Sequence, residues 1–184
     1  MKIQPFHDFF TCCVGQWHSE RTYHYLVQGE IERSRTEFTV NPLTSPLKAK
    51  VFQDNQYTVV DDLAAIPGFQ LGFHTVSETG EEVSQQLNLL FVPTQQNDGI
   101  LEGDYLRDRA YEEDRPIISH FRFFPETREL LMTTRYTKVV SVDSITLINP
   151  TLRMRRILNY QRPPEDRPLE QVRLAGFGVE QKVS

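Results

Sequence analysis

The sequence predicts an all-β protein: an antiparallel, up-and-down β-barrel of about ten strands with a helix at its N-terminus. Short segments rich in β-branched and aromatic residues recur at near-regular spacing, and Gly, Pro, Asn or Asp bounds most of them. Within a segment such as residues 118–123, polar and apolar residues alternate, which places successive side chains on opposite faces of a sheet. The 184 residues suit one hydrophobic core, so we expect a single domain over residues 1–184.

A helix is expected before the first strand. Apolar residues recur there with the period of an α-helix, at Phe6, Phe9, Phe10, Cys13, Val14 and Trp17. Gly15 suits the end of this helix, because glycine readily adopts the left-handed conformation that often follows a last helical turn. A helix at this position can partly close the mouth of the barrel that follows it.

The predicted strands follow one another with turn signals between them. In chain order they cover residues 21–27, 34–40, 49–52, 56–60, 69–76, 83–92, 99–106, 117–124, 129–140, 142–148 and 151–160. Gly29 and Asn41-Pro42 mark the first two turns. Residues 162–168 are expected to form a loop. The weakly patterned tail within residues 163–184 is expected to be either a final edge strand or a mobile segment.

Charge and composition exclude several classes of protein. The net charge of −5 argues against nonspecific binding to nucleic acid, which requires a basic surface to neutralise phosphates. No apolar run approaches the roughly 18 residues that a transmembrane helix needs. The amino terminus also lacks the apolar stretch of a secretory signal. We therefore expect an intracellular protein with no membrane span and no nucleic-acid partner.

The two cysteines are the neighbours Cys12 and Cys13. Adjacent cysteines rarely form a disulfide because the geometry is strained, and the lack of a disulfide framework suits a reducing compartment. No spaced set of Cys and His predicts a zinc site, so no metal is expected. Both thiols lie in the apolar helical pattern, which favours buried, inert side chains over the alternative of a nucleophile.

Arginines gather near the end of the chain, although the chain as a whole is acidic. Arg153, Arg155, Arg156 and Arg162 form this group. On a strand, Arg153 and Arg155 lie on the same face because they are two residues apart. Arginine binds carboxylates through two parallel hydrogen bonds and keeps its charge at all relevant pH values. Such a pair is able to bind an acid group, and a solvated strand edge is the other interpretation.

Gly15-Gln16-Trp17 stands at the junction between the predicted helix and the strands. In this position it resembles the lipocalin signature, in which the tryptophan plugs the closed end of the barrel and an arginine of the last strand stacks on it. The resemblance implies that Trp17 is such a structural plug, with Arg153 or Arg155 as its partner. A guanidinium over an indole ring contributes about 0.5–2 kcal/mol.

Three further blocks carry a more specific resemblance. They are residues 9–26, which include Phe9-Phe10 and Arg21-Thr22-Tyr23-His24, residues 106–112, and Asn149-Pro150-Thr151-Leu152-Arg153-Met154-Arg155. In this order they resemble the CpcS/CpeS-type phycobiliprotein lyases. The resemblance implies a barrel like those of lipocalins and fatty-acid-binding proteins. It also implies a chromophore lyase that binds a linear tetrapyrrole bilin, phycocyanobilin or a related one, as its transferred substrate.

In this family the bilin is delivered to a cysteine of a phycobiliprotein subunit, where it forms a thioether. The acceptor supplies the nucleophile. The resemblance further implies the cytoplasm of a cyanobacterium or the stroma of a plastid as the compartment.

The resemblance assigns candidate roles to several side chains. Arg153 and Arg155 are the first candidates for binding the two propionates of the bilin. Arg21 and His24 are candidate pocket residues, and His24 can hydrogen-bond a lactam carbonyl or a propionate. Because they are three residues apart, a regular strand directs at most one of them into the lumen. Glu112 is a candidate acid that would keep the chromophore protonated.

Alternatives remain open at this point. Arg21 can instead pair across strands with an acid such as Glu30, and His24 can be an ordinary strand histidine. Trp17 is the single tryptophan, whereas many family members carry others near the segment that corresponds to residues 69–74. This departure raises the alternative that the chain works as a heterodimer with a paralogous subunit, and a homodimer is a further alternative. Two other classes are a non-catalytic carrier of a fatty acid or other amphiphile, and a β-sandwich interaction module without a cavity.

Overall fold

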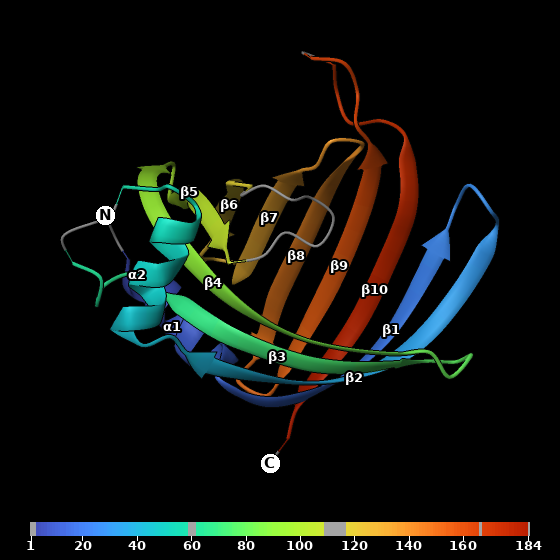
Figure 1. The fold of residues 1–184 in the computed structure, drawn as a ribbon, viewed down its shortest axis with the longest axis horizontal. Coiled ribbons are helices and arrows are strands. Elements are labelled where there is room, and N and C mark those ends of the chain that lie inside the picture. Colours follow the sequence, from blue (N-terminus) through green and yellow to red (C-terminus); the bar gives the residue numbers. More distant parts are fainter. Residues whose placement is uncertain (1–2, 59–61, 109–116, 166, 184) are drawn as a thin grey trace.

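The computed structural model describes residues 3–58, 62–108, 117–165 and 167–183, and over this part of the chain it is a closed, ten-stranded antiparallel barrel with two helices (Figure 1). The strands are β1 (Gly15–Tyr25), β2 (Glu30–Pro42), β3 (Gly68–Ser77), β4 (Glu82–Asn97), β5 (Ile100–Arg107), β6 (Ser119–Phe124), β7 (Glu129–Arg135), β8 (Val139–Asn149), β9 (Leu152–Gln161) and β10 (Val172–Lys182). Each strand pairs with its neighbours in the sequence, and β1 pairs with β10. The predicted up-and-down barrel is therefore confirmed.

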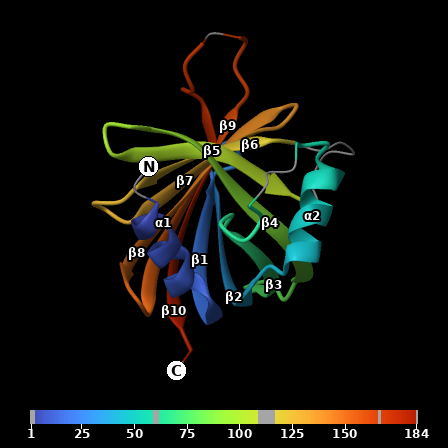
Figure 2. The ribbon, with the colours of Figure 1, turned by 90° about the vertical axis from the view of Figure 1, so that its left-hand side faces the viewer.

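Helix α1 (Gln4–Cys13) closes one end of the barrel, as the apolar stripe predicts. Pro5 suits its first turn because the missing N–H would have no partner within the helix. The ring of Phe6 stacks on Phe121 with 5.2 Å between centroids, and Phe10 lies 4.8 Å from Phe69. In Figure 2, the view toward this end places α1 in front of the strands.

Helix α2 (Ser45–Asp54) replaces the two strands predicted over residues 49–52 and 56–60. A short apolar run does not distinguish a strand from a buried helical turn, so that prediction was wrong. Val51 and Phe52 are fully buried and pack with Leu90 and Leu106 on the outside of β4 and β5. Residues 56–58 form no strand, and residues 59–61 lie outside the described part of the chain.

Strand β10 corrects the prediction of an edge strand or a mobile tail. It lies between β9 and β1 and completes the barrel, so it has a partner on both sides. Its sequence does not indicate a barrel strand clearly, because small and charged residues face the interior and large apolar residues face outward. Gly176, Gly178 and Glu180 point inward, whereas Phe177 and Val179 are about half exposed.

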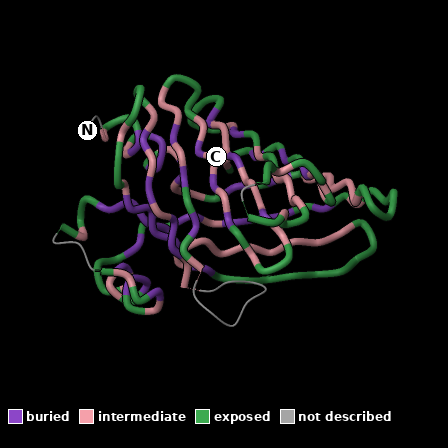
Figure 3. Tube along the Cα trace, turned by 90° about the horizontal axis from the view of Figure 1, so that it is seen from above, coloured by how far each residue is buried: buried purple, intermediate pink, exposed green. Residues whose placement is uncertain are grey.

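Burial is uneven along the barrel. Figure 3 shows the buried segments concentrated on the side of the N-terminus, whereas the hairpins at the far end are exposed. Phenylalanines of α1 and the strands fill the closed end. Beyond these phenylalanines, the interior of the barrel contains a cavity. In the described residues, no helix is long and apolar enough to cross a membrane.

Candidate ligand-binding site

The Gly-x-Trp junction forms a tightly packed corner at the closed end. Gly15 has φ +132°, a backbone conformation that residues with a side chain rarely adopt, so this position favours glycine. Trp17 is buried, and its Nε1 donates a 2.9 Å hydrogen bond to the carbonyl of Cys13. The guanidinium carbon of Arg153 lies 4.6 Å from the Trp17 ring centroid. Of the two arginines offered by the sequence, Arg153 is the one that stacks on Trp17.

A buried ion cluster lies next to this corner. The Nε of Arg153 donates to Glu180, which has no exposed side-chain surface, and a nitrogen of Arg21 lies 3.6 Å from the other Glu180 oxygen. Arg21 therefore pairs with an acid on the neighbouring strand, as the alternative interpretation of this residue allowed, but the acid is Glu180 and not Glu30. Burial alone would raise the pKa of Glu180, but Arg153, Arg155 and Arg21 together hold it below its usual range. Glu180 therefore stays charged in the folded protein.

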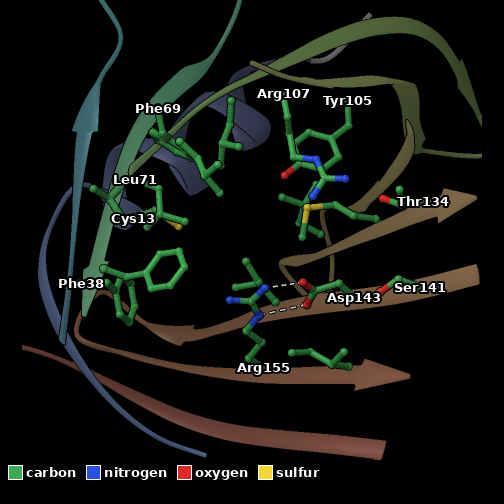
Figure 4. Close-up of a pocket in the computed structure, with 18 of the residues that line it drawn as sticks. Cys13, Phe38, Phe69, Leu71, Tyr105, Arg107, Thr134, Ser141, Asp143 and Arg155 are labelled. Atoms are coloured by element: carbon green, nitrogen blue, oxygen red, sulfur yellow. Dashed lines mark hydrogen bonds and ion pairs between the residues drawn. The ribbon is translucent and has the colours of Figure 1, made fainter. Parts of the chain in front are cut away.

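A cavity of about 460 Å³ occupies the interior beyond the closed end (Figure 4). This is within the size range of sites for small organic ligands. Its walls are largely apolar, and Phe38, Leu71, Phe73, Leu89, Leu130 and Met132 are among the lining residues. Phe9, Phe10 and Cys13 of α1 also line it. The cavity can therefore surround an extended apolar molecule.

A bidentate ion pair stands on one wall. The Nε of Arg155 donates to the Oδ1 of Asp143 at 3.0 Å, and its Nη2 donates to the other oxygen (Figure 4). Burial lowers the pKa of Arg155, but Asp143 outweighs this effect and raises the pKa overall. Sequence reasoning missed Asp143. The available signal was an aspartate within the predicted strand over residues 142–148, a place where aspartate is uncommon.

Arg107 lines another wall, at the end of β5. Its guanidinium carbon lies 5.6 Å from the Tyr105 ring centroid and 5.7 Å from that of Tyr136, and its Nη2 donates to the Tyr136 hydroxyl at 2.8 Å. Burial raises the pKa of Tyr105 to about 12, so its hydroxyl remains protonated. None of these three residues was assigned a role from the sequence, although Arg107 belongs to the block of residues 106–112 that carries the family resemblance.

The structure does not bring all the candidate residues together. Arg21, Arg153 and Arg155 line the cavity, but His24 lies on the outer face of β1, with its ring centroid 6.3 Å from that of Phe177. The alternation along β1 explains this correction, because Arg21 and Tyr23 take the inward positions. The candidate acid, Glu112, lies outside the described residues.

The two cysteines occupy different environments. Cys12 is partly exposed, whereas Cys13 is buried against the cavity. Burial raises the pKa of the Cys13 thiol, although Arg153 opposes the effect. A thiol with a raised pKa is a poor nucleophile because little thiolate is present. This environment favours the structural interpretation of Cys13.

These features define the class of protein: a lipocalin-like barrel, closed at one end by an N-terminal helix and a Gly-x-Trp corner, with an internal amphipathic site. A family model described as CpeS-like protein matches residues 5–183. The chain therefore belongs to the CpeS-like family.

Two relatives illustrate the range of similarity. The chain is 60% identical over 182 residues to a protein of Synechococcus sp. (strain JA-3-3Ab) named Chromophore lyase CpcS/CpeS 1, covering 99% of this chain and 98% of the relative. It is 27% identical over 148 residues to Chromophore lyase CpcS/CpeS of Thermosynechococcus vestitus, covering 80% of each chain.

A solved structure supports the fold independently. The S-type phycobiliprotein lyase CPES from Guillardia theta superposes with a TM-score of 0.77, covering 100% of this chain and 97% of that chain. The two sequences are 15% identical, so the likeness concerns the fold alone.

Proposed function

We propose that this protein is a phycobiliprotein chromophore lyase, which binds a linear tetrapyrrole bilin in its barrel and delivers it to a cysteine of a phycobiliprotein subunit. The observation that carries the proposal is the apolar cavity with positive charges in its wall. The chain also aligns over nearly its whole length with a chromophore lyase at 60% identity. A bilin combines an extended apolar framework with two propionates, so its chemistry matches this cavity.

The charges in the wall favour an acidic ligand. Arg21, Arg107, Arg153 and Arg155 line the cavity, whereas Asp143 is the one carboxylate among the described lining residues. Glu180 lies behind the wall and pairs with Arg153. Even when Glu180 is included, the cations in this set outnumber the carboxylates by two. A dianionic ligand balances this excess better than a fatty acid, which carries one charge, and this comparison disfavours the carrier alternative.

We assign the direct ligand contacts to the Arg155–Asp143 pair. Arg155 presents a guanidinium to a propionate, and Asp143 can accept hydrogen bonds from the pyrrole N–H groups while remaining paired with Arg155. Arg153 is more deeply buried, stacks on Trp17 and donates to Glu180. Its proposed role is to support the site from the closed end of the barrel. Arg21, which also lines the cavity, is proposed to make a weaker contact with the ligand. His24 is not part of the proposal because it lies outside the barrel.

The proposed reaction adds the acceptor thiol to the ethylidene group of the bilin. A bond forms between the acceptor sulfur and the ethylidene carbon, the thiol proton ends on the tetrapyrrole, and no group leaves. The barrel contributes by holding the bilin in one conformation with its reactive end accessible. Such positioning supplies up to about 7–11 kcal/mol in favourable cases. This chain forms no covalent bond with the bilin.

Several finer assignments belong to the same proposal. The bilin is phycocyanobilin or a close relative, and the protein acts alone, as a homodimer or with a paralogous subunit. The reaction takes place in the cytoplasm of a cyanobacterium or in the stroma of a plastid. The cyanobacterial sources of the aligned lyases support this location.

One experiment tests the proposal directly. The purified protein is mixed with phycocyanobilin and an apo-phycobiliprotein subunit, and covalent attachment is followed by absorbance after denaturation. We expect thioether formation that is faster and more uniform than without the protein, and none with an acceptor whose target cysteine is replaced by alanine. Tight bilin binding without transfer, even with a paralogous subunit present, would instead identify a carrier.

A further inference from the structure

The strand order places Arg107 and Arg155 on facing walls of the cavity. Arg107 ends β5 and Arg155 lies in the middle of β9, with β6, β7 and β8 between them in the ten-stranded ring of described strands. Figure 4 shows the two side chains reaching toward the interior from opposite sides of the pocket. A ligand that fills the cavity lies between these two guanidiniums.

The Arg107 side chain is held in place by its aromatic neighbours. It lies near both the Tyr105 and Tyr136 rings and donates to the Tyr136 hydroxyl. Tyr105 itself is buried and stacks on Phe91 with 4.8 Å between centroids. Because aromatic faces attract a guanidinium and restrict its plane, its N–H groups are oriented before a ligand arrives.

The two arginines also share an electrostatic environment. Burial is the main cause of the raised pKa of Tyr105. Arg107 and Arg155 both act to lower this pKa, and Asp143 acts to raise it. The Tyr105 side chain is therefore within electrostatic reach of both walls. Arg107 and Arg155 thus belong to one site.

Arg153 is less suitable than Arg107 for a second acid group. Only 5% of Arg153 is exposed, and its guanidinium lies 4.6 Å from the Trp17 centroid and 5.0 Å from the Phe38 centroid while its Nε donates to Glu180. Arg107 is only partly buried.

We infer that Arg107, held by Tyr105 and Tyr136, binds the second acid group of the ligand opposite Arg155, so that the cavity selects molecules with two carboxylates. This inference rests on the proposed function. It names a specificity-determining residue that the Arg-x-Arg pair on β9 does not include. A bilin is then held by one propionate on each wall, and a ligand with one or no acid group lacks one or both of these contacts.

The test compares phycocyanobilin with its dimethyl ester in wild type, Arg107→Gln and Arg107→Lys. For each protein, the ratio of the two dissociation constants reports how much the acid groups contribute. We expect Arg107→Gln to weaken binding of the diacid about tenfold or more, the usual effect of losing a contact with a charged group, with little change for the ester. Arg107→Lys, which keeps the charge, should restore part of the discrimination.

The matched control is Arg122→Gln on β6. Arg122 also lies near an aromatic ring, 5.2 Å from the Phe124 centroid, and pairs with Glu102, but it is not among the lining residues. For Arg122→Gln, we expect the ratio of the dissociation constants of phycocyanobilin and its dimethyl ester to equal that of wild type. An equal loss of affinity for diacid and ester in Arg107→Gln, or no loss for either, would overturn the inference. Absence of phycocyanobilin binding by wild type would overturn the proposed function itself, so the two failures are distinguishable.

Discussion

Arg153 and Arg155 show how neighbouring residues divide two roles between chemically identical side chains. They lie on the same face of β9, as their spacing predicts. Arg153 faces Trp17 and Glu180 at the closed end, whereas Arg155 pairs with Asp143 beside the cavity. The spacing of the two arginines indicates their shared face. Their different partners come from β1, β8 and β10, which the local pattern of β9 does not contain.

Glu180 should make stability depend on pH. Its pKa is lower in the folded state than in the unfolded chain, so the charged form contributes stability above about pH 4.3, the ordinary value for glutamate. That contribution is lost as the pH falls through the folded-state pKa. At pH 7, Glu180→Gln should cost about 3–5 kcal/mol because it leaves buried arginines without their carboxylate.

Urea denaturation at several pH values checks this expectation. The difference between wild type and Glu180→Gln should shrink as the pH falls below about 4, because protonated glutamate resembles glutamine. Glu37→Gln serves as the control, since 72% of the Glu37 side chain is exposed. A stability difference that stays constant from pH 7 to pH 3 would contradict the electrostatic role of Glu180.

The cysteines should be dispensable for chromophore transfer. Cys13 is a buried thiol with a raised pKa, and the proposed mechanism uses only the thiol of the acceptor. The double substitution Cys12→Ser, Cys13→Ser should therefore keep bilin transfer, measured with any partner subunit present. Loss of transfer in a folded double variant that still binds bilin would reveal a covalent intermediate on this chain.

At the scale of elements, α1 closes the barrel through its phenylalanines. Phe6 is completely buried and contacts Phe10, Phe121 and Phe123. Phe6→Ala should reduce the free energy of unfolding by about 3–5 kcal/mol, the typical cost of removing a buried aromatic side chain. Urea denaturation measures this loss. Phe177→Ala is the matched control, since Phe177 is 52% exposed, and a similar cost for both variants would argue against a packing role of α1.

The elements differ in how far local sequence predicts them. Helix α1 and most strands follow from periodicity, because one face of each is buried in the common core. Helix α2 buries Lys48, Val51 and Phe52, which have helical spacing, but the pattern is concealed because lysine counts as a polar residue. Strand β10 carries Gly176 and Gly178 on its inner face. A Cβ at Gly176 would lie 2.7 Å from the Tyr23 ring, so this position reflects a neighbouring strand that the local pattern does not reveal.

At the scale of the whole molecule, the closed end and the cavity have opposite effects on stability. Packed aromatic side chains and the Trp17–Arg153 corner stabilise one end. At the cavity of about 460 Å³, the lining side chains lack packing contacts on the side that faces the empty space. Among the described lining residues, four arginines and one aspartate surround that space. A ligand that fills the cavity and balances its charge should therefore stabilise the entire barrel.

Bilin binding should raise the thermal midpoint of the protein. A ligand that binds only the folded state adds about 2.7 kcal/mol when its concentration is 100 times the dissociation constant. For a domain of this size, each kcal/mol shifts the midpoint by about 2–4 °C, so saturating phycocyanobilin should raise it by about 5–10 °C.

Thermal unfolding with phycocyanobilin, its dimethyl ester and a fatty acid checks this. The diacid should give the largest shift because it alone satisfies both Arg107 and Arg155, and Arg155→Gln should reduce that shift while Arg122→Gln leaves it unchanged. A fatty acid that stabilises wild type as strongly as phycocyanobilin would favour the carrier function, since one carboxylate would then suffice to satisfy the cavity.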